Sequence, residues 1–595
     1  MSPPAAQAGP RPDPNQAKLA AAVQAWLAAD PDPATRAQLA AAWQAAQQGD
    51  RAALDEVASA FAGPLEFGTA GLRGQLGPGP NRMNRAVVIR AAAGLMAYLA
   101  DGIVQAGAAG LAPKVVVGYD ARHRSQEFAR DTAAVVVAAG GRALLWEQAC
   151  PTPLLAFAVR RLRADAGVMV TASHNPAQDN GCKVYLGGRL ASPPADGVQI
   201  VPPADREIAA RIAAAPPANQ VPRAARGWER IGAEQEREYL RQAVSGVAPA
   251  AGAADLRIVH TAMHGVGARL AVPALRAAGF EDIHQVDSQR APDPDFPTVA
   301  FPNPEEPGAI DLANALAERI GADLVIAQDP DADRCAVAVY DPRAPQGGGW
   351  RRLTGDELGA LLGEDLAKYW AEAPAAADGA RPAVACSVVS SRLLGRIARA
   401  HLLRFERTLT GFKWIARTPG LVFGYEEAIG YCVRPDMVRD KDGITAGLAV
   451  ARLAARAKLA GRSLIDLLDD LARRHGLHAT AQVALRFRDS AELAGVMRSL
   501  RRAAPKRVGA TPVSRITDLA AGWEGLAAAD ALIFSLADSA RLIVRPSGTE
   551  PKVKCYLEVV EPVPPQADFQ TLTRLRAQAA RRLALLAGGA RALFG

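Results

Sequence analysis

The sequence predicts an α/β protein of several domains, and three observations carry this prediction. Short apolar segments rich in β-branched residues alternate with helical segments, as at 114–120, 126–139 and 143–146, and this alternation is typical of parallel βαβ units. From about residue 478 the strand-like segments follow one another more closely, which indicates a smaller α+β domain. At 595 residues the chain exceeds one hydrophobic core, so about four domains are expected.

Composition and charge narrow the class of protein. With 49% hydrophobic and 22% charged residues, the chain has the composition of a globular protein. The net charge of +8 comes from arginines scattered among Ala-rich segments. Because the sequence has no run of basic residues, the positive charge does not indicate nucleic-acid binding. Small anionic substrates or an excess of surface arginine explain the charge equally well.

The spacing of the cysteines and the hydropathy of the chain indicate in which cellular compartment the protein is expected. Six cysteines lie far apart without a Cys-x-x-Cys motif, so we expect neither a disulfide framework nor a zinc cluster, and we expect a cytoplasmic location. No apolar run is long enough to span a membrane, and residues 1–15 lack the apolar segment of a secretory signal. We therefore expect no membrane partner.

The elements follow in order along the chain. The first residues, up to about 15, are expected to form a disordered tail, and 17–60 an Ala-rich helical extension that acts as a structural cover. Later strands are expected at 167–170, 256–260, 323–327, 383–389, 421–424, 482–486, 531–535, 542–545 and 553–558, and a last helix at 568–587. The predicted domains are 1–60, 61–230, 231–345, 346–475 and 476–595.

A serine directly follows one of the predicted strands. Residues 171–176, Thr-Ala-Ser-His-Asn-Pro, place Ser173 just past the strand at 167–170, where open α/β sheets position their active sites. The alternative is an ordinary strand-to-loop turn, because Ser, Asn and Pro are common turn residues. Upstream, the glycine-rich stretch 67–74 would let the backbone approach an anion, and its Arg73 offers a planar fork of donors for phosphate.

Three aspartates indicate a metal site. Asp329, Asp331 and Asp333 alternate after a strand, and on an extended strand end this spacing turns the three carboxylates to one side. Like charges so close repel unless a cation lies among them, and oxygen ligands alone favour Mg²⁺ or Ca²⁺. An EF-hand is excluded because its sixth and twelfth positions are Arg334 and Tyr340. A solvated acidic turn is the structural alternative.

Two further motifs suit a phosphorylated sugar. Residues 424–430, Gly-Tyr-Glu-Glu-Ala-Ile-Gly, place two carboxylates after a strand, and carboxylates accept hydrogen bonds from vicinal hydroxyls. They could equally be surface glutamates. Residues 545–552, Arg-Pro-Ser-Gly-Thr-Glu-Pro-Lys, gather donors for a phosphate within eight residues.

In this order, the four motifs resemble those of the α-D-phosphohexomutases, the family of phosphoglucomutase and phosphomannomutase. The resemblance extends from about residue 60 to the C-terminus, with one motif in each predicted domain. It implies three consecutive mixed-sheet α/β domains followed by a smaller α+β domain around a central cleft. It also implies an intramolecular phosphotransferase that uses Mg²⁺, a phosphoserine and a sugar 1,6-bisphosphate activator.

The resemblance assigns roles to individual residues. Ser173 would be the phosphoserine and would bind Mg²⁺ together with Asp329, Asp331 and Asp333. The other expected catalytic residues are Arg73, His174 and Lys183; Lys183 is the candidate general acid/base, because an amine can change its protonation and a guanidinium cannot. The expected substrate-binding residues are Arg334, Thr410, Gly411, Lys413, Glu426, Ala428, Arg545, Ser547, Gly548, Thr549 and Lys552.

One departure concerns the sugar. Many family members have Gly-Glu-x-Ser-Gly-His in the sugar loop, whereas this chain has Ala428 and no histidine there. With residues 410–415 and 440–443, the loop looks more like the branch of phosphopentomutases and glucose-1,6-bisphosphate synthases. We expect a mutase that acts on glucose phosphate, and the alternatives are a phosphopentomutase and a glucose-1,6-bisphosphate synthase. The protein is expected to be a monomer or a homodimer. A non-catalytic sugar-phosphate-binding regulator is a third possibility.

Overall fold

The computed structural model describes residues 14–68, 71–245, 251–344, 348–372, 381–547 and 552–594. Residues 1–13 of the expected tail lie outside this set. The chain forms two compact units, each described by itself: unit 1 comprises Met1–Glu236 with Pro292–Pro302, and unit 2 comprises Arg237–Ala291 with Asn303–Gly595.

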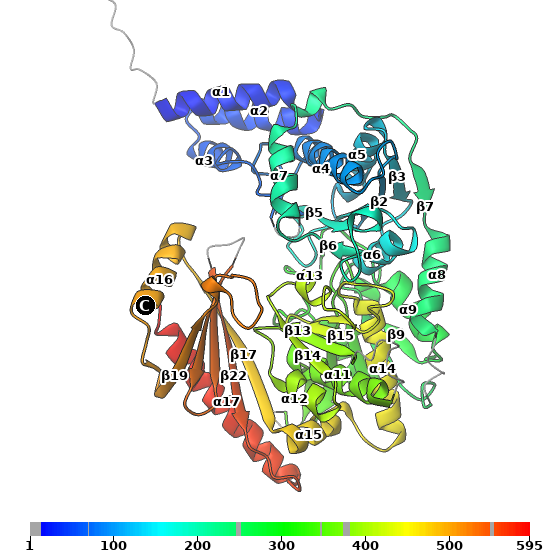
Figure 1. The fold of residues 1–595 in the computed structure, drawn as a ribbon, viewed down its shortest axis with the longest axis vertical. Coiled ribbons are helices and arrows are strands. Elements are labelled where there is room, and N and C mark those ends of the chain that lie inside the picture. The colour runs from blue at the N-terminus through cyan, green and yellow to red at the C-terminus, as the bar shows by residue number, and fades with distance from the viewer. Residues whose placement is uncertain are drawn as a thin grey trace, which may run out of the picture. The chain divides into compact units, whose positions relative to one another are not determined.

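A mixed sheet of seven strands forms the centre of unit 1 (Figure 1). Its order is β1-β5-β4-β2-β3-β7, with β6 beside β5. β2, β3, β4 and β7 run parallel, whereas β1, β5 and β6 run antiparallel to their neighbours. The bounds are β1 Gly71–Gln75, β2 Lys114–Tyr119, β3 Arg142–Trp146, β4 Ala166–Val170, β5 Asp179–Leu186, β6 Val198–Gln199 and β7 Glu229–Ile231.

Four helices accompany this sheet: α4 Arg85–Gln105, α5 Ser125–Ala138, α6 Thr152–Arg161 and α7 Ala204–Ala214. By length and composition α4 could cross a membrane, but half of its most apolar window is buried, and the helix packs against α5 and α7. A core helix of this kind meets the same criteria as a membrane span. The side chain of Asn84 caps its first turn by accepting from the Val87 amide.

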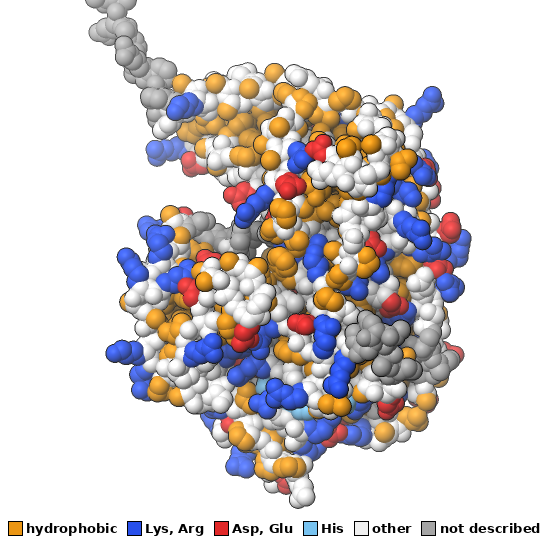
Figure 2. Space-filling view, viewed as in Figure 1, with side chains coloured by type: hydrophobic (Ala, Val, Ile, Leu, Met, Phe, Trp, Pro, Cys, Tyr) orange, Lys and Arg blue, Asp and Glu red, His pale blue; other side chains and the backbone are white. Residues whose placement is uncertain are grey.

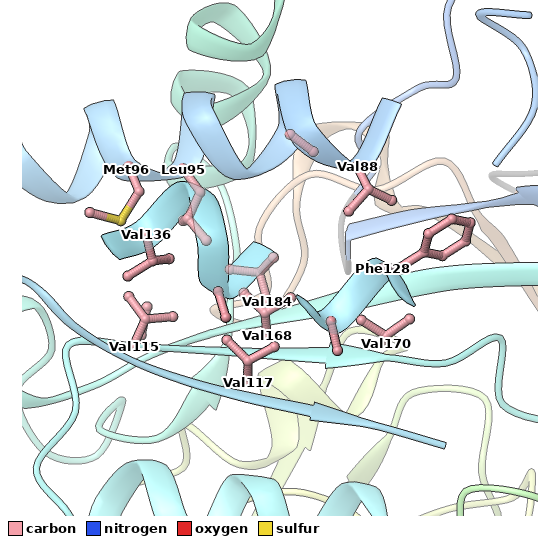
Figure 3. Packing of buried hydrophobic residues seen from close by; sticks show 14 of the residues in the cluster. Val88, Leu95, Met96, Val115, Val117, Phe128, Val136, Val168, Val170 and Val184 are labelled. Carbon is pink, nitrogen blue, oxygen red and sulfur yellow. The ribbon is translucent and has the colours of Figure 1, made fainter. Parts of the chain in front are cut away.

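The core of unit 1 lies between α4, α5 and the sheet (Figure 3). The buried side chains shown there are Val88, Leu95 and Met96 of α4, Phe128 and Val136 of α5, and Val115, Val117, Val168, Val170 and Val184 of the strands. Full burial of each such side chain contributes about 1.5–3 kcal/mol. This packing fixes the strand ends that carry the candidate site.

The expected N-terminal extension is helical. It consists of α1 Pro14–Ala29, α2 Pro33–Gln47 and α3 Arg51–Ala60. Val23, Leu39 and Trp43 belong to its own small core. Trp26 packs against a buried cluster of unit 1, and Asp32 forms an ion pair with Arg124 at the start of α5. The extension is thus docked on unit 1 by both apolar and charged contacts.

The described residues of unit 2 form three sheets, with strand orders β12-β11-β10-β8-β9, β14-β13-β15-β16 and β17-β22-β21-β20-β19-β18. The first two mix parallel and antiparallel pairs, and the third is antiparallel. The strands are β8 Ile258–Thr261, β9 Ile283–Gln285, β10 Leu324–Ala327, β11 Ala336–Asp341, β12 Gly349–Arg352, β13 Ala383–Ser387, β14 Arg404–Thr408, β15 Leu421–Glu426, β16 Gly430–Cys432, β17 Leu477–Arg486, β18 Arg507–Val508, β19 Thr511–Asp518, β20 Leu532–Leu536, β21 Arg541–Pro546 and β22 Lys552–Glu561.

The remaining helices are α8 Ala233–Val244, α9 Ala268–Ala277, α10 Asp311–Ile320, α11 Gly355–Glu372, α12 Leu393–Ala400, α13 Phe412–Ile415, α14 Gly443–Leu459, α15 Leu464–His475, α16 Ser490–Arg502 and α17 Phe569–Arg591. Mixed sheets with helices, followed by an antiparallel sheet with α16 and α17, confirm the predicted α/β class (Figure 1). The domain boundaries stay predictions.

One segment differs from its expected form. The glycine-rich stretch around Arg73 is not among the expected strands, but from Gly71 onward it is strand β1, paired antiparallel with β5. Gly71 has φ +125°, and a Cβ there would lie 1.9 Å from the Cys182 carbonyl oxygen, so only glycine fits. The strand forms through pairing with a distant segment, which local sequence does not reveal.

Candidate active site

Ser173 lies in the loop after β4 of unit 1. It is buried and has φ +53°, a left-handed conformation that costs a non-glycine residue about 1–2 kcal/mol. Its amide donates to Thr171 Oγ1 at 2.8 Å, and its Oγ lies 3.2 Å from His174 Nδ1. The serine is therefore held in one strained conformation with its hydroxyl beside an imidazole.

Arg122 holds the serine loop. Its buried guanidinium lies 5.0 Å from the Phe296 ring centroid. It donates to the main-chain oxygens of Ser173 at 2.7 Å, Asn175 at 2.5 Å, Pro176 at 2.7 Å and Asp179 at 3.1 Å. No role for Arg122 was predicted from the sequence, where its only signal is its position just after β2. It fixes the backbone that carries the serine.

The other expected catalytic residues of unit 1 lie around this loop. Arg73 of β1 donates from NH1 to Asn175 Oδ1 at 3.2 Å. The His174 ring packs against Phe301, with centroids 5.9 Å apart. Lys183 of β5 is buried, and its register neighbours are Gly71 on β1 and Met169 on β4. Unit 1 thus brings Arg73 and His174 to the Ser173 loop and sets Lys183 on the strand beside it.

The three aspartates lie in unit 2, directly after β10. All are buried, and one carboxylate oxygen from each lies within 4.8 Å of the others. The segment is a turn with Ala332 at φ +56°, not the extended strand end that was expected. The carboxylates converge nevertheless, and a buried set of three oxygen donors fits a hard cation such as Mg²⁺.

Two cations flank the triad. The Arg334 amide donates to Asp329 Oδ1 at 3.1 Å, and its side chain lies 3.8 Å from Asp329 and 3.9 Å from Asp333. Lys441 Nζ lies 3.1 Å from Asp333 Oδ2. Burial opposes the charge of Lys441, but Asp333, Asp440 and Glu426 outweigh it and raise the pKa of this amine above its usual value. Sequence reasoning missed this role of Lys441.

The motif around Lys441 is fitted to the triad turn. The Gly443 amide donates to the Ala332 carbonyl at 3.1 Å. A Cβ on Gly443 would lie 2.2 Å from the Arg334 carbonyl oxygen, so no other residue fits without displacing the turn. Asp442 caps α14 by accepting from two amides of its first turn, and Tyr239 donates to both its oxygens at 2.8 Å.

Glu426 connects the expected sugar loop to the segment at 410–413. Its Oε1 accepts from the Gly411 amide at 2.8 Å. Burial raises the pKa of Glu426, and Lys441 opposes that shift. Thr410 and Ala428 are half-buried, and Lys413 is buried with Nζ 5.9 Å from the Trp414 ring centroid. The triad, Lys441 and Glu426 are therefore neighbours in unit 2.

The two glutamates of the loop differ in their partners. Glu427 Oε2 accepts from Ser387 Oγ and from Ser390 Oγ, each at 2.9 Å. These bonds fix the loop to the end of β13. Glu426 accepts from the Gly411 amide and interacts electrostatically with Lys441, so it is the carboxylate placed toward the triad. Glu427 is the one that anchors the loop.

The expected phosphate cradle is described only in part. Arg545 lies on β21, Lys552 begins β22, and the Ser547 amide donates to the Lys552 carbonyl at 2.8 Å. Gly548 and Thr549 lie outside the described residues. Lys554, which sequence reasoning missed, pairs in register with Arg545; burial lowers its pKa, and Glu427 opposes that shift. The cradle strand is therefore within electrostatic reach of the sugar loop.

Comparisons with known proteins match this arrangement. Residues 64–218, 237–342 and 354–475 match the alpha/beta/alpha domains I, II and III of phosphoglucomutase/phosphomannomutase, and residues 502–563 match the C-terminal domain of that family. A solved structure of a putative phosphomannomutase from Thermus thermophilus has a TM-score of 0.62 and 23% identity, and the match covers 88% of this chain and 99% of that one. This likeness shows a shared fold.

Curated relatives are more similar in sequence. A probable phosphomannomutase of Haemophilus influenzae is 42% identical over 82% of this chain and 95% of its own length. A phosphopentomutase of Mus musculus is 34% identical over 85% of this chain and 86% of its own. With four matching domains in order, the chain belongs to the phosphoglucomutase/phosphomannomutase family of mutases, which are isomerases of the phosphotransferase type.

Proposed function

We propose that the protein interconverts sugar 1-phosphate and 6-phosphate, with glucose as the sugar, through a phosphoserine at Ser173 and a bisphosphate intermediate. The observation that carries the proposal is the fixed conformation of Ser173, a buried, strained residue whose loop is clamped by Arg122. A protein that only binds sugar phosphates needs no serine so positioned. It also needs no buried carboxylate triad.

In the proposed reaction, phosphorylated Ser173 gives its phosphoryl group to the free hydroxyl of a sugar monophosphate. The O–P bond to Ser173 breaks as the new bond to the sugar forms, and Lys183 takes the proton of the attacking hydroxyl and passes it to the departing serine oxygen. The bisphosphate then turns around, and its other phosphate returns to Ser173 while Lys183 carries the serine proton to the departing sugar oxygen. Arg73 stabilises charge on the transferring group, and His174 orients the serine oxygen.

We propose Mg²⁺ as the cofactor, held by Ser173 and the three aspartates. When bound, the ion neutralises charge on the transferring phosphoryl group. Arg334 and Lys441 keep the carboxylates in place from either side. The approach of Ser173 to the triad belongs to this proposal. A sugar 1,6-bisphosphate is the proposed activator, because it can phosphorylate Ser173.

Substrate recognition is assigned to two sets of residues. Glu426 would bind the sugar hydroxyls, supported by its contact with Gly411, and Thr410, Lys413 and Ala428 would line the same loop. The non-reacting phosphate would be held by Arg545, Ser547, Gly548, Thr549 and Lys552. Either phosphate of the bisphosphate must fit this second set, and a group of flexible charged donors suits that requirement.

A pentose phosphate is the second candidate substrate. The name of the mouse relative and Ala428 in the sugar loop favour it. A sugar-bisphosphate synthase remains the alternative in which the intermediate is released. Cytoplasmic location and a monomeric or homodimeric state stay predictions.

Steady-state assays separate these functions. Purified protein with Mg²⁺ and a trace of glucose 1,6-bisphosphate is given glucose 1-phosphate, mannose 1-phosphate or ribose 1-phosphate, with Ser173→Ala as control. A higher kcat/KM for glucose 1-phosphate supports the proposal. A higher kcat/KM for ribose 1-phosphate would identify the protein as a phosphopentomutase instead. Release of bisphosphate would favour the synthase. Substantial mutase activity of Ser173→Ala would overturn all three.

A further inference from the structure

A basic cavity lies in unit 2 where α15 runs into β17. It has a volume of about 710 Å³, is lined from α12, α15, β22 and α17, and shares no residue with the active site proposed above. Figure 2 shows Lys and Arg side chains gathered around histidines on the face over α12 and α15. Its volume is in the range of sites for small molecules.

The lining of this cavity is dominated by cations. Its two acids, Asp538 and Glu561, both bind one arginine, Arg582, at 2.7 Å and 2.5 Å. The arginines of the lining are Arg392, Arg396, Arg473, Arg474 and Arg582. Among the lining side chains themselves, arginines therefore outnumber acids.

Three of these arginines are held from behind. Arg392 Nε binds Glu558 at 2.6 Å, Arg473 NH1 binds Asp470 at 2.8 Å, and Arg474 NH1 binds Glu364 at 2.5 Å. Each keeps one terminal nitrogen that makes no hydrogen bond among the described residues. Cations fixed in this way lose little side-chain entropy when they bind a ligand.

Arg396 differs from these three. It is exposed on α12, and within the described part of the chain it forms neither an ion pair nor a hydrogen bond. An arginine fork with all its donors available, beside pre-positioned guanidinium groups, is suited to the oxygens of a phosphate group. The cavity is larger than one phosphate needs, so the ligand class it fits is a phosphorylated small molecule.

A chain of contacts joins the cavity wall to the sugar loop. Glu558 binds Arg392 of the wall and, at 3.1 Å, Arg541. Arg541 donates to the Ser390 carbonyl at 2.6 Å, and Ser390 Oγ donates to Glu427 at 2.9 Å. An anion that binds Arg392 competes with its pairing to Glu558 and so acts, through Arg541 and Ser390, on the residues that anchor the loop at Glu427.

We propose that this cavity is an effector site for a small phosphorylated anion, and that its occupancy changes the affinity of the protein for its sugar phosphate. The effect of the anion on sugar-phosphate affinity rests on the proposed function. By linkage, the sugar phosphate must then change the affinity for the effector by the same factor.

The binding test uses calorimetry at constant ionic strength. Inorganic phosphate, glucose 1,6-bisphosphate and ADP are titrated into the protein in an Arg545→Gln background, which weakens phosphate binding at the proposed active site. Arg396→Gln should lower the affinity at least about tenfold, as expected for the loss of charge-assisted hydrogen bonds. The matched control is Arg399→Gln, an exposed arginine of the same helix outside the cavity lining, which should bind as before.

The coupling test uses the protein with Arg545 intact. The KM for glucose 1-phosphate is measured against the tightest of the three anions, for wild type and for Arg396→Gln. The anion competes with glucose 1-phosphate at the active site equally in wild type and in Arg396→Gln. A difference between the two proteins in how KM responds to the anion therefore reflects binding in the cavity. In the binding test, equal anion affinity of the Arg545→Gln protein with and without Arg396→Gln, or an equal loss with Arg399→Gln, overturns the site. An identical KM response overturns the effector role. The binding result needs no turnover, so it stands apart from the proposed function.

Discussion

Replacing Arg122 by alanine tests how the serine loop is held. The guanidinium donates to four main-chain oxygens of the loop and lies 3.4 Å from the buried Asp120. Each hydrogen bond to a charged group contributes about 1.5–3 kcal/mol. These contributions do not add in full, because the four hydrogen bonds share one guanidinium and water can replace some of them in the variant. The expected loss of unfolding free energy is therefore that of removing one partner of a buried ion pair, about 3–5 kcal/mol.

The effect on activity follows from Ser173. Once the clamp is gone, the remaining contacts, such as the bond from the Ser173 amide to Thr171, offset less of the cost of its left-handed conformation, about 1–2 kcal/mol, and the loop relaxes. The reactive population, and with it kcat, should fall about 5–30-fold. The KM for glucose 1-phosphate should stay near the wild-type value, because Arg122 is not placed to touch the sugar.

The assay measures kcat and KM together with thermal unfolding and, by intact mass, the phosphorylation of Ser173. Arg122→Lys is the second variant, since one ammonium reaches fewer of the four oxygens and should give an intermediate kcat in a more stable protein. A folded Arg122→Ala protein with wild-type kcat would refute the reasoning.

Four further outcomes are expected. Gly443→Ala should weaken Mg²⁺ binding in a titration, because the added Cβ would displace the Arg334 carbonyl 2.2 Å away; unchanged affinity would contradict the fit of the triad turn. Tyr239→Phe removes the donor to Asp442 and should lower the free energy of unfolding by about 1–3 kcal/mol in urea, while a neutral result would mean that the cap of α14 is satisfied without it. Burial lowers the pKa of His260 to about 4. As pH falls below about 6.5, this histidine is therefore protonated in the unfolded state before it is protonated in the folded state, and the free energy of unfolding drops by up to about 3 kcal/mol by pH 4. His260→Gln should remove that part of the slope, and an unchanged slope would assign it elsewhere. EDTA should abolish turnover and Mg²⁺ should restore it; full activity in EDTA would rule out the proposed role of the ion.

Local sequence predicted the strands and helices well where they are driven by short apolar runs. The strand before Ser173 and the one before the aspartates are buried β segments, and their patterns do not depend on distant residues. Strand β1 was missed because it exists only through pairing with β5, more than a hundred residues later. The triad turn was likewise expected to be extended, whereas Ala332 takes a left-handed conformation that its sequence does not signal.

Residue types were enough to predict that the three aspartates come together, but not which residues hold the site in place. Asp329, Asp331 and Asp333 converge as expected. Arg122 and Lys441 were missed because their importance lies in which atoms they reach: Arg122 meets main-chain oxygens about fifty residues away, and Lys441 meets Asp333. A main-chain acceptor has no signature in a sequence. Only the folded chain reveals these contacts.

The central claim is that Ser173 carries the transferred phosphoryl group. Its most direct test is incubation with radiolabelled glucose 1,6-bisphosphate, peptide mapping, and a chase with unlabelled glucose 1-phosphate. The account predicts label on Ser173 of the wild type, transfer of that label to the sugar during the chase, and no labelled peptide from Ser173→Ala. Turnover by the wild type with no label on Ser173, or equal labelling of Ser173→Ala, would contradict it.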